Sequence, residues 1–152
     1  MKFYLFILTV LCTLSGFSQN ENKRVAHFNL EKNVALQGYD PVAYFKQGKA
    51  VKGKKEIVAT HEGVVYYFSI PDNKEYFLKN PSKFEPQYGG WCAFAMGDSN
   101  EKVAINPETF KINNGKLYLF YNAFFNNTLK SWNKEEAGLM VKADANWSKI
   151  VK

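Results

Sequence analysis

The stretch GYDPVAYF, residues 38–45, recurs in altered form 52 residues later as GWCAFAMG, residues 90–97. In both segments an aromatic residue follows the first glycine and an alanine occupies the sixth position. Related segments separated by a fixed offset are the sequence signature of an internal repeat. The pattern therefore predicts two structurally related units in the chain.

The same offset carries EIVATHEG onto ETFKINNG and GVVYYF onto GKLYLF. Each unit should therefore contain a β-hairpin whose turn, in HEG or NNG, ends in the glycine that a positive φ favours. A further strand is predicted before each hairpin, in VAYF and in CAFAM. The predicted hairpin strands are residues 57–60, 64–69, 110–112 and 116–121.

A short helix is predicted after each hairpin. In the first unit Asp72 serves as the cap, Tyr76 and Phe77 face the core, and Asn80 followed by Pro81 ends the helix.

In the second unit Asn122 is the predicted cap. Phe125, Leu129 and Trp132 recur at i, i+4 and i+7, which places them on one helical face.

A final helix is predicted near residues 135–147, and residues 20–34 are predicted to be an extended lead-in. The apolar stripe of the final helix is Leu139, Met140, Ala143 and Trp147. These elements predict an α+β fold of two pseudo-repeated β-hairpin-plus-helix units around one core, related by a pseudo-twofold axis, plus a C-terminal helix.

The first 19 residues have the pattern of an export signal. A single basic residue, Lys2, precedes an apolar run, and small residues stand at Gly16 and Ser18. The apolar run is shorter than the ~20 residues that a transmembrane helix needs. We therefore expect a signal peptide at residues 1–19, a single domain at residues 20–152, an exported protein that is periplasmic or secreted, and no transmembrane anchor.

Cleavage would remove one lysine and no acidic residue, so the formal charge would fall from +6 to +5. The basic residues are scattered lysines, and Arg24 is the only arginine. Nucleic-acid binders cluster their basic groups and favour arginine, so no nucleic-acid partner is predicted.

Long segments of the chain carry a family resemblance. The strings GYDPVAYF, GKAVKG, GVVYYFSIPDNKEYFLKNPSKFEPQYGGWCAFAM and GKLYLFYN, with a terminal A-x-x-x-W, resemble the exported, single-domain branch of the YHS-domain family. That family is similar to TRASH-like metal-binding modules, and other YHS domains occur in copper-transporting ATPases and beside bacterial monooxygenases. The resemblance implies metal handling. However, Ser69 and Ile70 stand where the cysteine-rich versions place a cysteine, and serine is a poor ligand for soft metals.

Cys92 is the one cysteine that would remain after cleavage, because Cys12 lies in the signal. Cu(I) accepts two or three soft ligands, so a copper ion held by Cys92 and His61, with Met96 as a third ligand, is one hypothesis. His27 is the other imidazole of the chain. Free cysteines are more often small core residues. The repeat also pairs Cys92 with Asp40, which needs a polar partner if it is buried.

The alternative hypothesis is a metal-free domain that binds a small molecule or another protein, with Cys92 buried in the core. Its predicted ligand-binding residues, which lie beside the glycine turns, are Tyr39, Asp40, Tyr88 and Trp91. For the aromatic residues, burial in the core is the competing interpretation. No CxxC pair and no known hydrolase motif is present, so an enzyme is not predicted, although thiol chemistry at Cys92 stays open.

Overall fold

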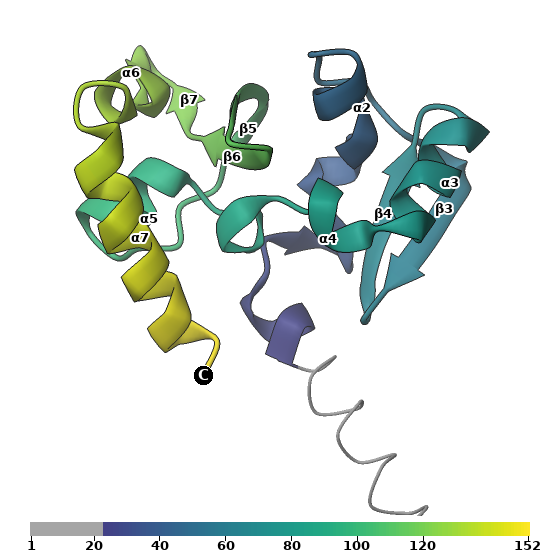
Figure 1. The fold of residues 1–152 in the computed structure, drawn as a ribbon, viewed down its shortest axis with the longest axis horizontal. Coiled ribbons are helices and arrows are strands. Elements are labelled where there is room, and N and C mark those ends of the chain that lie inside the picture. The colour runs from purple at the N-terminus through teal and green to yellow at the C-terminus, as the bar shows by residue number, and fades with distance from the viewer. Residues whose placement is uncertain (1–22) are drawn as a thin grey trace, which may run out of the picture.

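The computed structural model describes residues 23–152 as two units that meet at a shared core, with a long helix against the second unit (Figure 1). The predicted signal peptide lies outside the described residues. A helical segment at residues 23–27 opens this part of the chain. The lead-in is thus helical at residues 23–27, where the sequence predicted extended chain, whereas residues 30, 31 and 34 lie in strands. Lys, Arg and Ala are good helix formers.

The first unit contains a four-stranded sheet in the order β1-β2-β4-β3, in which only the β2–β4 pair is parallel. Its elements are β1 (Leu30–Glu31), β2 (Val34–Ala35), η1 (Leu36–Gly38), α2 (Pro41–Lys46), β3 (Lys54–His61), β4 (Val64–Phe68) and α3 (Pro71–Lys79). A short helix, α4 (Pro81–Phe84), leads to the second unit.

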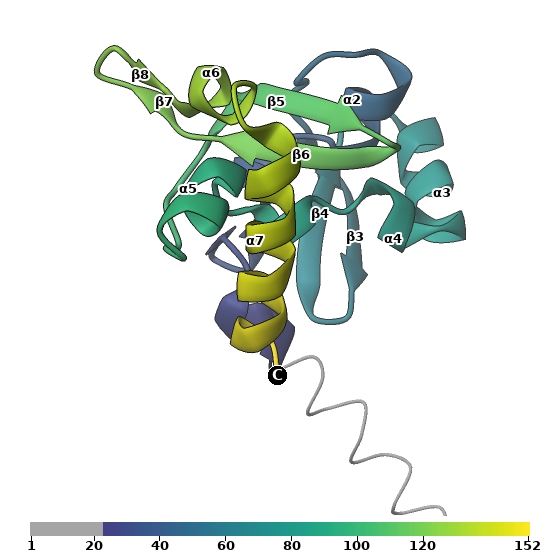
Figure 2. The ribbon, with the colours of Figure 1, turned by 60° about the vertical axis from the view of Figure 1, so that its left-hand side comes forward.

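The second unit contains the β5–β6 hairpin and a smaller β7–β8 hairpin. Its elements are η2 (Gln87–Gly90), α5 (Ala93–Asp98), β5 (Asn106–Asn113), β6 (Lys116–Phe120), β7 (Asn122–Ala123), β8 (Asn126–Asn127), α6 (Thr128–Trp132) and the long α7 (Glu136–Ile150). Figure 2 shows α7 running past one end of β6 and over α5.

The predicted repeat is present in the backbone. α2 and α5 begin and end 52 residues apart, as do β3 and β5, and β4 and β6. Both hairpins also have an irregularity at the same place, after Lys54 in β3 and after Asn106 in β5. The α+β class and the two related hairpin-plus-helix units are therefore confirmed.

The strands predicted in VAYF and CAFAM are wrong, because both segments are helical (α2 and α5). Asp40 caps α2 by accepting hydrogen bonds from the backbone N–H groups of Val42 and Ala43. Pro41 then occupies the first helical position, where its missing N–H costs nothing. The apolar run was too short for periodicity to separate strand from helix.

Two helix-start predictions also need correction. α3 starts at Pro71, with Asp72 in its first turn instead of at the cap, and Tyr76 is exposed, whereas Phe77 is buried. In the second unit Asn122 lies in β7, and the side chain of Asn127 caps α6 by accepting from the Leu129 N–H.

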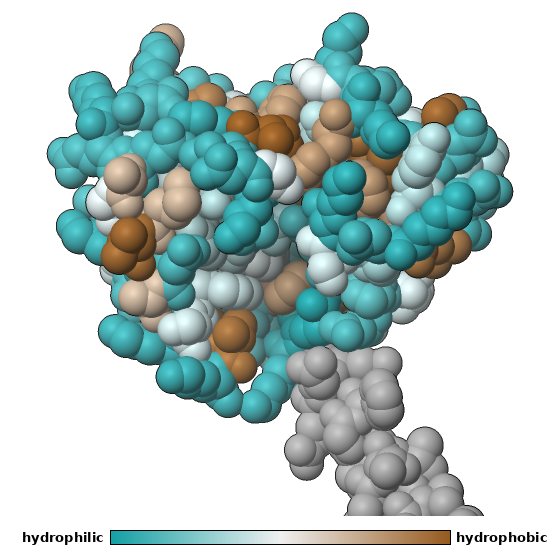
Figure 3. Space-filling model, in the orientation of Figure 1, coloured by the Kyte–Doolittle hydropathy of each residue, from teal (hydrophilic) through white to brown (hydrophobic). Residues whose placement is uncertain are grey.

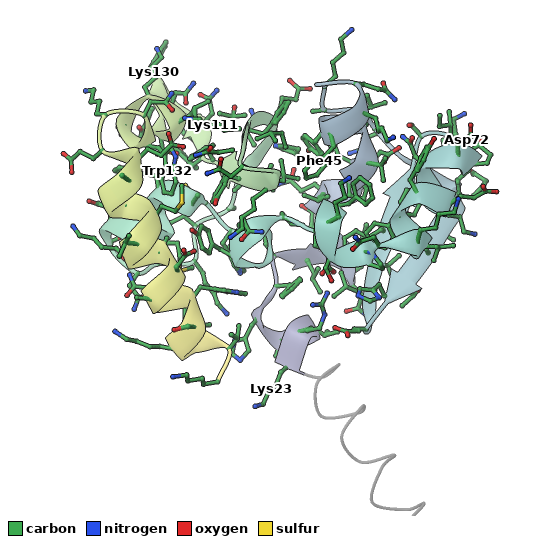
Figure 4. All side chains as sticks on the ribbon, in the orientation of Figure 1. Lys23, Phe45, Asp72, Lys111, Lys130 and Trp132 are labelled. Carbon is green, nitrogen blue, oxygen red and sulfur yellow. The ribbon has the colours of Figure 1, made fainter. Side chains whose placement is uncertain are left out.

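The core consists of two adjoining clusters. The larger cluster joins both units, because Val64 and Phe68 of the first hairpin pack with Leu117 and Leu119 of the second. The smaller cluster fixes α7 against α5 and β6 through Met96, Tyr118, Trp132, Leu139 and Ala143. Trp132 points inward from α6 (Figure 4).

The α5–α7 contact depends on Gly97. A Cβ atom at this position would lie 2.5 Å from the carbonyl oxygen of Leu139. We predict that Gly97→Ala lowers the free energy of unfolding by about 2–3 kcal/mol, because the two helices must separate. Gly138→Ala is the control, since its Cβ meets nothing within 4 Å; it should raise stability by about 0.5–1 kcal/mol through helix propensity. Urea denaturation measures both, and a neutral Gly97→Ala would contradict the close packing.

Candidate functional site: the aromatic cleft

Asp40 is fully buried and serves the fold. In addition to capping α2, its Oδ2 accepts hydrogen bonds from the Ser69 N–H (2.7 Å), the Ser69 hydroxyl (2.6 Å) and the Asn73 amide (2.7 Å). The carboxylate thereby fastens the start of α2 to the end of β4 and to α3. With its two oxygens occupied in this way, Asp40 is a structural residue in this conformation instead of part of an open ligand site.

Cys92 occupies the equivalent place in the second unit, before α5. Its Sγ lies 3.4 Å from the Tyr121 N–H, which is 52 residues beyond the Ser69 N–H that Asp40 accepts, and 3.4 Å from the Thr128 hydroxyl. The side chain has no exposed surface and belongs to the larger core cluster. Cys92 is also one of the residues that line a depression of about 280 Å³.

His61 is far from Cys92 in the chain and has different neighbours. It ends β3, and its ring packs edge-on against Phe77. Between residues 23 and 152 no group of three or more His, Cys, Asp or Glu side chains is arranged to hold a metal ion. The contacts described for Cys92, with Tyr121 and Thr128, and for His61, with Phe77, do not link the two side chains.

The predicted aromatic residues divide between the two units. Tyr39 lies under the Lys52 ammonium, 4.6 Å from its ring centroid, and its hydroxyl donates to Glu108 over 3.3 Å. Trp91 donates its indole N–H to the His27 carbonyl over 2.7 Å. Tyr88 alone of the four predicted ligand-binding residues lines the cleft described next.

A cleft of about 350 Å³ lies between α4, η2 and α7, on the hollowed face shown in Figure 3. Three aromatic side chains line it: Phe28, Tyr88 and Trp147. We call it the aromatic cleft. Its size falls within the range of roughly 300–1,000 Å³ that is usual for small-molecule sites.

Gly89 makes this convergence of rings feasible. Its φ is +59°, and a Cβ there would lie 2.8 Å from both the Phe28 and Trp147 rings. The backbone of η2 is tied to the lead-in, because the Asn29 N–H donates to the Gly89 carbonyl and the Asn29 amide donates to the Gly90 carbonyl. The Phe28 and Trp147 rings consequently meet with centroids 6.0 Å apart.

Two carboxylates, those of Glu85 and Asp144, are among the polar groups of the cleft. The Tyr88 hydroxyl donates to Asp144 Oδ1 over 2.9 Å. Burial, followed by the hydrogen bond to Asp144 and its negative charge, raises the pKa of Tyr88 well above its usual value, so the phenol stays protonated. Glu85 already pairs with Arg24 and accepts from the Tyr66 hydroxyl. Among residues 23–152 no Lys or Arg lies within 4.0 Å of the Asp144 carboxylate.

Sequence reasoning found Tyr88 but missed Phe28, Asp144 and Trp147 as cleft residues. These residues belong to the lead-in and to α7, which are separated by more than 100 positions. Trp147 was assigned to the core stripe of α7, and it does pack against the smaller core cluster from the cleft side. No local pattern in the sequence marks such a convergence.

In comparisons with known proteins, no family model, no curated protein and no solved structure matches this chain.

We predict that Asp40→Ala lowers the free energy of unfolding by about 3–5 kcal/mol, since α2 loses its cap and the buried Ser69 and Asn73 groups lose their acceptor. Asp72→Ala is the control, because Asp72 is exposed on α3 (Figure 4) and contributes only about 0.5 kcal/mol through the helix dipole. Urea denaturation monitored by circular dichroism compares the two. Similar losses for both variants would show that Asp40 is not the structural tie described above.

Proposed function

We propose that this chain is an exported binding protein that holds a small organic cation in the aromatic cleft. The apolar N-terminal pattern supports export. The observation that supports the ligand class is the Asp144 carboxylate, which lies beside Tyr88 and Trp147 without a cationic side chain paired to it among residues 23–152. Aromatic faces attract cations through their quadrupole, and a nearby carboxylate adds a Coulombic attraction.

The polar rim of the cleft is consistent with this ligand class. Besides Asp144, the lining includes the hydroxyls of Ser82 and Ser148 and the amide of Gln87. A ligand with an apolar body and one ammonium group would place the body against Phe28 and Trp147. No catalytic group is required for this activity, so the proposal is one of binding.

Copper binding through Cys92 and His61 stays a prediction from the family resemblance, and membership of the YHS-domain family likewise stays a prediction. The environment of Cys92 favours the metal-free alternative, because the thiol is buried and contacts Tyr121 and Thr128.

We expect the Cys92 thiol to react with a thiol reagent at least ~100-fold more slowly in the folded protein than in urea, since it has no exposed surface. Cys92→Ser should lower thermal stability without changing the Cu(I) content of the dialysed protein. Tight binding of one Cu(I) that Cys92→Ser abolishes would instead establish the copper hypothesis, and His61→Ala would then be the next variant.

Benzyltrimethylammonium is a suitable probe of the aromatic cleft. We expect it to bind residues 20–152 with an affinity that Asp144→Asn weakens about three- to tenfold, because the substitution removes the charge but keeps an acceptor for Tyr88. Phenylacetate, of similar size and opposite charge, should bind more weakly than the cation. Tryptophan fluorescence and calorimetry measure the affinities.

The matched control is Asp98→Asn, which neutralises an exposed carboxylate in the depression above Cys92. It should leave the affinity unchanged. The proposal fails if the wild-type protein does not bind the cation at millimolar concentration, or if Asp144→Asn and Asp98→Asn have equal effects.

A further inference from the structure

The β7–β8 hairpin presents two aromatic side chains to solvent. Its turn is Phe124-Phe125, and the relative exposures of these residues are 91% and 110%. Figure 2 shows this hairpin projecting from the body of the protein beside α6. We call residues 122–127 the Phe finger. No other large hydrophobic residue between positions 23 and 152 reaches this degree of exposure; the next is Val141 at 70%.

The backbone of the finger does not favour phenylalanine. Phe124 and Phe125 both have positive φ, at 49° and 64°. Positive φ is strained for side chains other than Gly, Asn and Asp, and the two larger hairpins use a glycine at the second turn position, Gly63 and Gly115. The two phenylalanines thus occupy strained backbone positions, and because their rings are almost fully exposed to solvent, little packing offsets that strain. Such a combination is typical of a functional site.

A protein partner is a poor fit to this shape. Two phenylalanine rings offer at most roughly 400 Å² of contact, whereas a stable interface buries about 800 Å² on each side. Three of the four strand positions of the finger are asparagines and the fourth is the small Ala123, so no large apolar side chain extends the surface of the rings. A projecting tip with so little contact area fits best a partner that does not need a preformed complementary surface. The interfacial region of a lipid bilayer meets that requirement, because it accepts aromatic rings without a complementary pocket.

The charge of the protein is also suited to a membrane surface. Lys130 on α6 is exposed and points outward at the end of the molecule that carries the finger (Figure 4). Residues 20–152 have a formal charge of +5, since Lys2 is the only charged residue among the first 19. Basic side chains near a membrane are attracted to anionic headgroups.

We propose that the Phe finger inserts its two rings into the interface of an anionic lipid bilayer and so holds the protein at the membrane surface. The part of the chain that the structure describes contains no helix that could span a bilayer. Attachment through the finger is peripheral, and it is independent of the aromatic cleft, whose lining residues do not include the finger.

The test uses residues 20–152, which contain all of the described structure, and vesicles of phosphatidylcholine with about 30% phosphatidylglycerol. The decisive variant is Phe124→Asn/Phe125→Gly. Asn-Gly is the preferred sequence for a turn with two positive φ values. The double variant should therefore fold at least as well as the wild type, with a thermal midpoint unchanged or raised by about 3 °C. Its partition onto the vesicles, measured by co-sedimentation, should fall about tenfold or more, since both inserting rings are gone.

Val141→Ser is the matched control, because it removes an exposed apolar side chain from α7 and should leave the partition unchanged. Binding of the wild-type protein to pure phosphatidylcholine should be weaker than to the anionic vesicles. Three results overturn the proposal: no vesicle binding by the wild type at low salt, equal binding by the double variant, or a concentration-dependent dimer in light scattering that the double variant abolishes. The last result would identify a second copy of the chain as the partner of the finger.

Discussion

The buried Asp40 carboxylate holds the first unit together. It is the cap of α2, the acceptor for the backbone N–H that follows β4, and the partner of Asn73 in α3. A charged group with no access to water is tolerated only when its hydrogen-bonding capacity is used, and here five donor contacts use it.

In the second unit the Cys92 thiol takes the place of the Asp40 carboxylate as hydrogen-bond acceptor, and it is the weaker acceptor of the two. The Cys92 thiol accepts a hydrogen bond from the Tyr121 N–H, as the Asp40 carboxylate does from the Ser69 N–H. The backbone matches as well: the Cys92 N–H donates to the Val103 carbonyl and the Asp40 N–H to the Val51 carbonyl, with donors and acceptors both 52 positions apart. Because sulfur is a weak hydrogen-bond acceptor, the Cys92 thiol stabilises the second unit mainly by filling space in the core. The unit depends instead on α7, which covers α5 and has no counterpart in the described part of the first unit. The repeat thus explains why a cysteine stands at this point of the chain without requiring it to be a ligand.

Much of the fold was predictable from the sequence because two independent features indicate the hairpins: the glycines at their turns and the constant offset of 52 residues between the two units. The hairpins were therefore located to within a few residues, and the final helix was found from its stripe. α2 and α5 were taken for strands because a short run of apolar residues has no resolvable period. The β7–β8 hairpin was missed because its turn consists of Phe124 and Phe125, whereas hairpin turns are normally marked by Gly, Asn or Asp. Of the cleft, only Tyr88 was found, since the other groups converge through tertiary packing.

The larger core cluster draws on both hairpins, with Val64 and Phe68 from one and Leu117 and Leu119 from the other. Neither unit could bury these side chains alone, since each supplies the other's missing apolar surface. Although the backbone is repeated, the two hairpins therefore share one core cluster. The repeat in this chain thus joins two related halves through the apolar side chains that lie between them.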